Sequence, residues 1–207
     1  MRVAIVGGTG PFGTALATRL RPADRFEVVI GSRDPERAAA AATELGVAGA
    51  SNAEAVRSAD LVVLATKADA ALETARALRD VVGETPVLCV ASELRVTRLG
   101  VFPGPDAISL AERLQAELRG PVLAGLHSLA ASSLAGAEPP DEDAFVCGDD
   151  PGAKALALEL AEQVTAGRAI DAGPLASARA LEGFTAVLVG INKRYGTHAG
   201  LKVTGLG

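Results

Sequence analysis

Three glycines directly after the first apolar run constrain the fold most strongly. Residues 3–6 read Val-Ala-Ile-Val, and the chain continues as Gly7-Gly8-Thr9-Gly10-Pro11-Phe12-Gly13. Gly8 permits a tight turn, Gly10 lets a pyrophosphate approach the backbone, and Gly13 lets a helix pack closely on the strand. Free N–H groups at the start of that helix then face the anion. The spacing Gly8-x-Gly10-x-x-Gly13 predicts a dinucleotide-binding turn; a merely tight turn between strand and helix is the alternative.

Short apolar runs alternate with longer segments rich in Ala, Leu, Arg and Glu up to residue 126. The runs are nearly continuous in Val, Ile, Leu and Ala, which is typical of strands covered on both faces. We expect strands at residues 3–6, 26–30, 47–50, 61–65, 87–90 and 122–126, and helices at 11–20, 35–45, 53–58, 69–82 and 106–118. This alternation predicts an α/β fold of the Rossmann type, with a doubly wound, mostly parallel sheet.

The composition of the sequence changes after residue 126. Residues 132–143 are rich in Ser, Gly, Pro and acidic side chains, so we expect a surface excursion there. A strand at 144–147, a helix at 151–165, a strand at 168–171 and a last helix at 175–194 are expected to follow. This part of the chain forms either a small second lobe or a small C-terminal α/β extension of the first sheet.

The composition argues against several classes of protein. Hydrophobic residues make up 49% of the 207 residues, which is too many for a disordered chain. The net charge of −5 and the aromatic content of 3% argue against a nucleic-acid binder. No apolar stretch reaches the roughly 18–20 residues of a membrane span, and no signal peptide is visible, so we expect a cytoplasmic protein. Cys89 and Cys147 are expected to be buried, reduced thiols.

The end of the second expected strand indicates which dinucleotide is bound. A site for NAD usually has Asp or Glu there to hold the ribose 2′-hydroxyl, whereas this chain has Gly31-Ser32-Arg33, with Arg37 one helical turn later. Ser32 can donate a hydrogen bond to a 2′-phosphate, and Arg33 can pair with it while stacking on adenine. A solvated pair of arginines is the alternative interpretation. The pattern favours NADP(H) over NAD(H).

Few side chains are candidates for acid–base chemistry. The only tyrosine, Tyr195, is followed four positions later by Ala199, so a short-chain dehydrogenase would lack its lysine. His127 follows the strand at 122–126, where open α/β sheets bind ligands, so it either lies near the substrate or bonds to a loop. We expect no metal site, because His127 and His198 have no further ligand at suitable spacing. The chemistry is therefore expected to reside in the cofactor.

Several further strings, in order along the chain, carry a family resemblance. They are Gly31-Ser32-Arg33, Leu126-His127-Ser128, Val146-Cys147-Gly148-Asp149-Asp150, Asp171-Ala172-Gly173-Pro174-Leu175 and the final Gly200-Leu201-Lys202. Together with the glycine turn they resemble the NADPH-dependent F420 reductases, also called F420-dependent NADP oxidoreductases. The resemblance covers essentially the whole chain. It implies a homodimer in which residues 1–128 form an NADP-binding Rossmann domain and residues 129–207 a smaller C-terminal lobe.

The resemblance also implies an activity and a set of site residues. Hydride would pass directly between NADP(H) and the deazaflavin coenzyme F420, which would lie in the cleft against the nicotinamide. The cofactor-binding residues would be Gly8, Thr9, Gly10, Pro11, Phe12 and Gly13 at the pyrophosphate, Ser32, Arg33 and Arg37 at the 2′-phosphate, and Ala65, Ala68, Ala91 and Ala131 on the nicotinamide side. Ser128, Ala199, Gly200 and Leu201 would approach the second coenzyme or substrate.

Two charged residues stand where the family is apolar. Lys67 and Glu93 follow the fourth and fifth expected strands. They either form a solvent-facing loop pair or orient a polar substrate and transfer protons. In the second case the chain is an NADPH-dependent reductase of another small molecule, a ketone or an imine, with Lys67, Glu93 and His127 as candidate acids. A non-catalytic NADP-sensing protein is a further alternative.

Overall fold

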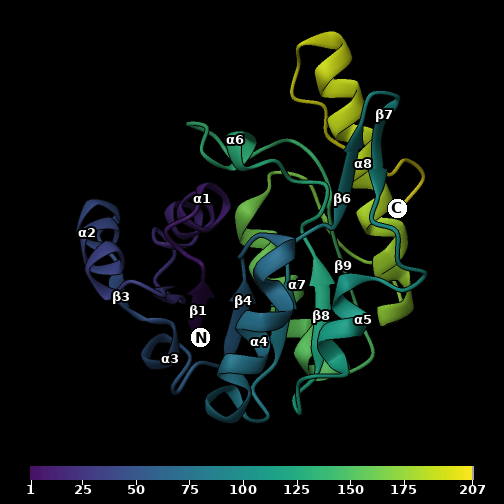
Figure 1. The fold of residues 1–207 in the computed structure, drawn as a ribbon. Helices are drawn as coiled ribbons and strands as arrows, with labels where there is room; N and C mark the ends of the chain where they lie inside the picture. Colours follow the sequence, from purple (N-terminus) through teal and green to yellow (C-terminus); the bar gives the residue numbers. More distant parts are fainter. Residues whose placement is uncertain (207) are drawn as a thin grey trace.

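Alternating strands and helices build one eight-stranded sheet with helices on both faces (Figure 1). The computed structural model describes residues 1–206. The first half of the chain contains β1 (Arg2–Val6), α1 (Pro11–Leu20), β2 (Glu27–Ser32), α2 (Pro35–Leu45), β3 (Ala48–Ser51), α3 (Asn52–Ala55), β4 (Leu61–Leu64), α4 (Ala68–Val82) and β5 (Val87–Cys89). The second half contains β6 (Leu94–Thr97), β7 (Gly100–Pro103), α5 (Leu110–Gln115), β8 (Val122–Gly125), α6 (Ala131–Leu134), β9 (Ala144–Gly148), α7 (Pro151–Val164), β10 (Ala169–Asp171), the 3-10 turn η1 (Leu175–Ser177) and α8 (Ala178–Tyr195).

The order of the strands places a topological switch point between β1 and β4. The sheet runs β10-β9-β8-β5-β4-β1-β2-β3, so the chain moves outward from β1 to β3 and then returns to the other side of β1. The six strands β3, β2, β1, β4, β5 and β8, adjacent in that order, are parallel to one another. Ligands of open α/β sheets bind at the carboxyl ends of the strands beside such a switch point. The predicted fold class is confirmed.

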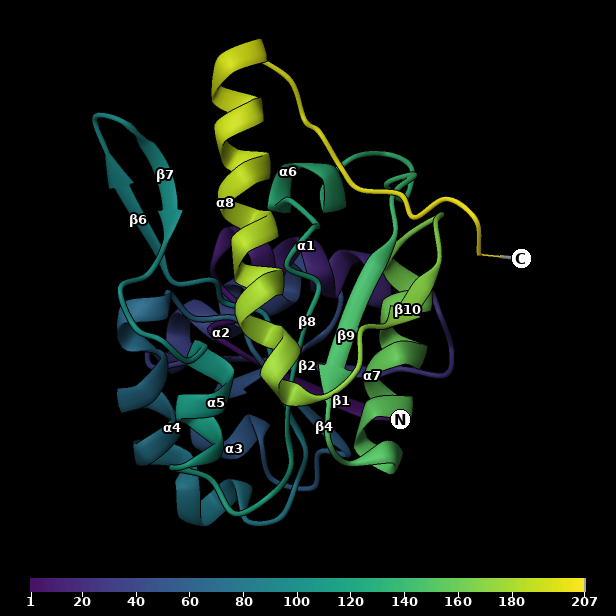
Figure 2. The ribbon, with the colours of Figure 1, turned by 90° about the vertical axis from the view of Figure 1, so that its right-hand side faces the viewer.

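The last two strands extend the same sheet. β9 pairs antiparallel to β8, with Ala124 opposite Cys147, and β10 pairs parallel to β9. Figure 2 shows β9 and β10 beside the carboxyl-terminal helix α8, with α7 behind them. Of the two arrangements left open by the sequence, the strands of this region therefore take the α/β extension.

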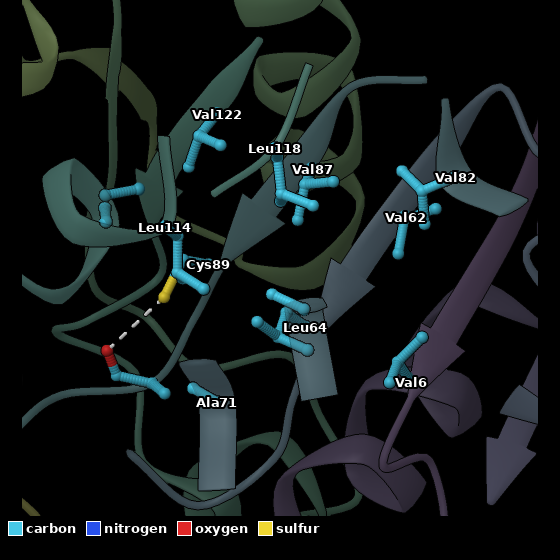
Figure 3. Close-up of a cluster of buried hydrophobic side chains, with 14 of the residues drawn as sticks. Val6, Val62, Leu64, Ala71, Val82, Val87, Cys89, Leu114, Leu118 and Val122 are labelled. Carbon is cyan, nitrogen blue, oxygen red and sulfur yellow. Dashed lines mark hydrogen bonds between the residues drawn. The ribbon is translucent and has the colours of Figure 1, made fainter. Parts of the chain in front are cut away.

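Two apolar clusters fill the two faces of the sheet. One face packs against α3, α4, α5 and the start of α8, and the other against α1, α2, α6 and α7. Figure 3 shows the first cluster, where the side chains of β4 and β5 meet those of α4 and α5. The inner strands β1, β4 and β8 are buried on both faces, which explains why their sequences do not alternate between apolar and polar residues.

The two cysteines lie inside this core. Cys89 and Cys147 are free and buried, as predicted, and both flank Ala124 in the sheet register. The thiol of Cys89 contacts the carbonyl oxygen of Ala91 at 3.7 Å (Figure 3). Burial raises the pKa of Cys89 to about 12 and that of Cys147 to about 11, so both remain protonated and unreactive at neutral pH.

Some expected helices are shorter than the sequence predicts. The helix expected at 106–118 is α5, which begins after Ser109 because Ser109 and Glu112 form a capping box. The helix expected at 53–58 is α3, which starts directly after its N-cap Ser51. Ser51 and Glu54 form a capping box. It cannot continue to residue 58, because Ser58 has a positive φ of 60°.

Three features have no counterpart in the expected elements. The hairpin of β6 and β7 lies in a segment for which no helix or strand is predicted. The short helix α6 lies at the start of residues 132–143, where a surface loop is expected. The last expected helix is divided into η1 and α8. The hairpin and α8 project together beyond the carboxyl edge of the sheet (Figures 1 and 2). None of the helices within residues 1–206 has the length and apolar character that crossing a bilayer requires.

Candidate functional site

A cleft of about 970 Å³ opens at the carboxyl ends of β1, β2 and β4. It lies at the switch point of the sheet, between the glycine turn, the start of α2 and the first turns of α4. The predicted residues that line it are Thr9, Gly10, Pro11, Phe12, Ser32, Arg33, Arg37, Ala65, Lys67 and Ala131. Residues that the sequence did not single out also line it: Gly7, Asp34, Asn52, Thr66, Asp69, Ala70, Glu73 and Thr74.

The glycine turn is shaped by close packing. A Cβ atom at Gly8 would lie 2.6 Å from Cβ of Ile30, and one at Gly13 would lie 2.7 Å from Cα of Gly8. Gly8 and Gly13 therefore shape the turn from behind, while Gly10 faces the cleft. The first helical hydrogen bond of α1 runs from the N–H of Thr14 to the carbonyl of Gly10, so the N–H groups of Phe12 and Gly13 in its first turn are available to an anion.

The end of β2 presents positive charge to the cleft. Arg33 and Arg37 are exposed, and neither forms an ion pair within residues 1–206. The nearby carboxylate of Asp34 accepts hydrogen bonds from the backbone N–H groups of Glu36 and Arg37, at 3.0 and 3.3 Å, and so caps α2. The acidic side chain that follows Arg33 in the sequence is thus engaged by a helix N-terminus and forms no ion pair with either guanidinium group.

A second cavity of about 320 Å³ continues the cleft toward β5. Phe12, Ala65, Thr66 and Lys67 line both cavities, and the second adds Ala68, Val90, Ala91 and Ser92. Ala68 and Ala91, predicted on the nicotinamide side, therefore lie here. The hydroxyl oxygen Oγ1 of Thr66 is buried at this junction without a hydrogen-bond partner. Small side chains and an unpartnered hydroxyl leave room and one polar contact for a flat ligand.

His127 lies behind the wall of the second cavity and lines neither. It is buried, and the carbonyl oxygen of its backbone accepts a hydrogen bond from Thr185 Oγ1 at 2.8 Å. Burial lowers the pKa of the imidazole to about 4, against a smaller opposing effect of a hydrogen bond to the Ala91 backbone. The ring is neutral at pH 7 and is no cationic acid. The neighbouring Ser128 is also buried and donates to the carbonyl of Asp143 at 2.9 Å.

The two charged candidates on the loops are not brought together. Lys67 lines both cavities and forms no ion pair within residues 1–206. Glu93 is turned away, and its carboxylate lies 3.0 Å from Nη1 of Arg113 and packs closely against Gly104. Arg113 also binds Asp106, so Glu93 belongs to a small ion cluster at the base of the hairpin. Of the three candidate acids, only Lys67 lines the cleft.

The chain end at residues 199–201 lies at a separate cavity of about 510 Å³. The N–H of Ala199 donates to Asn192 Oδ1 at 2.7 Å, and the carbonyl of Leu201 accepts from the N–H of Asp143 at 2.7 Å. Gly200 lines this cavity together with Glu142, and burial raises the pKa of Glu142 to about 7. The approach of residues 199–201 to a second coenzyme stays a prediction.

The sequence offered little that could have identified the additional lining residues. Asn52 and Asp69 lie in the first turn of a helix at the carboxyl edge, and Thr66 lies in the short loop between β4 and α4. That position alone is their signal, since none belongs to a motif. Within residues 1–206, no group of three or more His, Cys, Asp and Glu side chains could hold a metal ion.

Comparisons with known proteins agree with this geometry. The family model described as "NADP oxidoreductase coenzyme F420-dependent" matches residues 2–91, which include the glycine turn and both arginines. The F420-dependent NADP reductase of Methanothermobacter thermautotrophicus is 35% identical over 225 residues, covering 100% of this chain and 96% of that protein. The F420-dependent NADP reductase of Methanocaldococcus jannaschii is 33% identical and covers 100% and 99%.

A solved structure gives the same result for the fold. The crystal structure of a protein from Arthrobacter sp. FB24, provisionally assigned as an F420-dependent NADP reductase, matches with a TM-score of 0.85 at 25% identity, and the match covers 99% of both chains. The relatives and this structure are matched over almost their full lengths, so the likeness includes the C-terminal region as well as the glycine turn. This chain belongs to the family of coenzyme F420-dependent NADP oxidoreductases.

Proposed function

We propose that this protein is an enzyme that transfers a hydride between NADP(H) and coenzyme F420. The observation that carries the proposal is the two-part cleft. Its larger part runs from the unpaired arginines to the glycine turn, and its smaller part continues from Phe12 to the wall of small residues at Ala91. The relatives named F420-dependent NADP reductase, which match the chain over its full length, support the same activity.

NADP(H) is assigned to the larger cavity. The 2′-phosphate binds Ser32, Arg33 and Arg37, because two cations without protein partners suit a dianion. The pyrophosphate lies on the backbone of the glycine turn and the start of α1, where free N–H groups and the helix dipole favour negative charge. The residues given to this half of the cofactor are Gly8, Thr9, Gly10, Pro11, Phe12 and Gly13.

The nicotinamide is assigned to the junction of the two cavities, and the deazaflavin to the smaller one. When bound, the reduced nicotinamide supplies the hydride. The protein holds the two rings together and excludes water with small apolar residues, which are Ala65, Ala68, Ala91 and Ala131. Reduction of the deazaflavin takes up one proton as well as the hydride, and solvent at the open side of the smaller cavity would supply that proton. A protein acid is then not required at the rings, which agrees with a neutral, enclosed His127 and with a Glu93 bound to Arg113.

A single assay tests the activity. The protein is mixed with NADPH and oxidised F420, and the loss of deazaflavin absorbance is followed. The proposal is supported if turnover with NADPH falls in the variant Arg33→Ala and persists in Arg57→Ala. Arg57 is a suitable control because it is an exposed arginine that does not line the cleft. Binding of NADPH without turnover of F420, combined with turnover of a ketone or imine, would move the assignment to another substrate.

We also propose that the protein is a homodimer. α8 exposes the apolar side chains of Phe184, Val187, Ile191 and Tyr195, which recur at a helical spacing, and Val187 is 60% exposed. The hairpin beside it exposes Leu99, which is 92% exposed, together with Val96 and Phe102. An apolar face of this kind fits a second copy of the chain. Light scattering should give twice the chain mass, and the variant Val187→Asp should give the monomer.

A cytoplasmic location is proposed from the thiols. Both cysteines are free and buried, and a reducing compartment keeps such thiols unpaired. Cell fractionation with an antibody to the protein tests this location directly.

A further inference from the structure

One buried polar side chain at the cleft has no role in the function proposed above. Asn52 is the first residue of α3, directly after β3, and it is only 9% exposed. It lines the larger cavity, and its Oδ1 atom is buried with no hydrogen-bond partner among residues 1–206. A buried amide without a partner costs stability, so a native protein that keeps one there has another use for it.

The sheet register fixes where Asn52 lies. β2 and β3 pair with Gly31 beside Ala50 and Ser32 beside Ser51, so Asn52 is the next residue at the carboxyl edge, alongside Arg33. A Cβ atom at Gly31 would lie 2.8 Å from Oδ1 of Asn52. The glycine at position 31 therefore provides the space that the Asn52 amide occupies, next to the residues that read the ribose.

The Asn52 side chain is not used to cap its own helix. Asparagine is a favoured N-cap, but here the cap is Ser51, whose Oγ accepts from the N–H of Glu54 at 3.2 Å. The Glu54 carboxylate in turn accepts from the N–H of Ser51 at 3.1 Å. This capping box holds the start of α3 in place and leaves both ends of the Asn52 amide free.

We propose that Asn52 is a specificity residue for the phosphorylated ribose of NADP(H). The carboxamide offers one acceptor and two donors, and the ribose offers a matching pair of groups on adjacent carbons. Oδ1 accepts a hydrogen bond from the 3′-hydroxyl, and Nδ2 donates one to the 2′-phosphate. The broad torsion about Cβ–Cγ lets the amide turn toward the cavity at small cost. This inference rests on the placement of NADP(H) proposed above.

The variant Asn52→Asp tests the donor. It keeps an acceptor for the 3′-hydroxyl, loses the donor and adds a negative charge facing the 2′-phosphate. The ratio of the dissociation constants for NADH and NADPH, measured by fluorescence titration, should fall at least about tenfold, while the affinity for NADH changes by less than about twofold. An unchanged ratio would overturn the proposal.

The variant Asn52→Ala tests whether the role is structural. It should weaken NADPH binding about fivefold to twentyfold and leave the melting temperature unchanged, because the amide has no protein partner to lose. The matched control is Ser51→Ala, which removes the cap and should lower the melting temperature without changing the NADH-to-NADPH ratio. A lower melting temperature in Asn52→Ala, with equal loss of both coenzymes, would assign Asn52 to the fold and reject the proposal.

Arg33→Ala is measured in parallel to separate the two proposals. If Arg33→Ala also leaves NADPH binding unchanged, the placement of NADP(H) itself is wrong. If Arg33→Ala loses affinity and the Asn52 variants do not, only the inference about Asn52 fails.

Discussion

The cleft and the C-terminal region differ in whether their polar side chains have partners within the protein. Around the cleft, Arg33 and Arg37 form no ion pair within residues 1–206, and Asn52 and Thr66 each have a buried oxygen without a partner. In the C-terminal region, from 142 onward, charges are mostly matched. Three ion pairs there join an acid and a base at 2.8–2.9 Å, namely Arg168–Asp143, Arg179–Glu182 and Lys154–Asp171.

We propose that this difference separates residues that bind a ligand from residues that stabilise the fold. A paired charge contributes to the stability of the folded state. Its removal leaves the partner charge without a counter-charge. An unpaired polar group beside a cavity contributes little to the fold and gains its partner when a ligand binds. Mutations in the two regions should therefore act on different quantities, stability in one and affinity in the other.

The largest effect is expected on the paired side, at Asp143. Its carboxylate is 1% exposed and accepts from the backbone N–H groups of Arg168 and Val203, at 2.9 and 2.7 Å, and from the Arg168 guanidinium. Asp143→Ala leaves these donors without an acceptor and should lower the free energy of unfolding by about 2–4 kcal/mol. Urea unfolding measures this loss.

Asp143→Ala should lower stability and leave the affinity for NADPH almost unchanged. The folded fraction of the variant should bind NADPH within about twofold of the original affinity, a difference of about 0.4 kcal/mol. A variant of normal stability that has lost NADPH would show that the C-terminal region carries ligand contacts after all.

Arg33→Ala is the counterpart on the unpaired side. The loss of a charge-assisted hydrogen bond to the 2′-phosphate should weaken NADPH binding by about 1.5–3 kcal/mol, roughly tenfold to a hundredfold. The free energy of unfolding should change by less than about 0.5 kcal/mol, because Arg33 is exposed and unpaired. Fluorescence titration and urea unfolding of the same sample give both numbers, with Arg57→Ala as the control.

Glu142 is the exception in the C-terminal region. Its Oε2 atom is buried without a partner, and burial raises its pKa from 4.5 to about 7. The folded state therefore holds a proton that the unfolded chain releases near pH 4.5, so the stability from this group is complete below about pH 4.5 and is lost as the pH rises through 7.

Glu142→Gln should remove this pH dependence. The variant should match the original chain near pH 4.5 and should be more stable by about 1–2 kcal/mol at pH 8.5, where the original carries a buried charge. Urea unfolding at a series of pH values measures the difference between the two chains. The low pKa of Asp143 is present in both chains and cancels. A constant difference across this range would show that Glu142 titrates normally.

The sequence predicted the residues that line the two cavities better than those that lie outside them, such as His127 and Glu93. Gly8, Gly13 and Arg33 follow strands at set spacings, and local backbone geometry is enough to place such residues. Asn52, which also lines the cleft, was missed because its position there depends on pairing between β2 and β3 and on the space left by Gly31. The same is true of the hairpin of β6 and β7, whose strand β7 packs against α8, about 80 residues away in the chain.

Glu93 shows why a position at a strand end is not enough. It follows β5 at the carboxyl edge, as a candidate acid should, but Arg113 on α5 takes its carboxylate away from the cleft. No local pattern links residues 93 and 113. Lys67 follows β4 in the same way and has no such partner, so it lines the cleft. The two residues are alike in sequence context and differ only in what the tertiary fold puts beside them.

The smallest effect is expected from Glu93→Gln. The Glu93–Arg113 ion pair is partly exposed and contributes little, so the free energy of unfolding should fall by at most about 0.5–1 kcal/mol, and turnover of NADPH with F420 should remain unchanged. The matched variant Lys67→Met removes a charge that faces both cavities and should change the KM for F420 or NADPH while leaving stability intact. Steady-state kinetics measure the change in KM, and urea unfolding measures the change in stability, for both variants. If Glu93→Gln abolished turnover at normal stability, its carboxylate would have to leave Arg113 during the reaction, and the division between paired and unpaired residues would no longer identify the residues that act on the ligand.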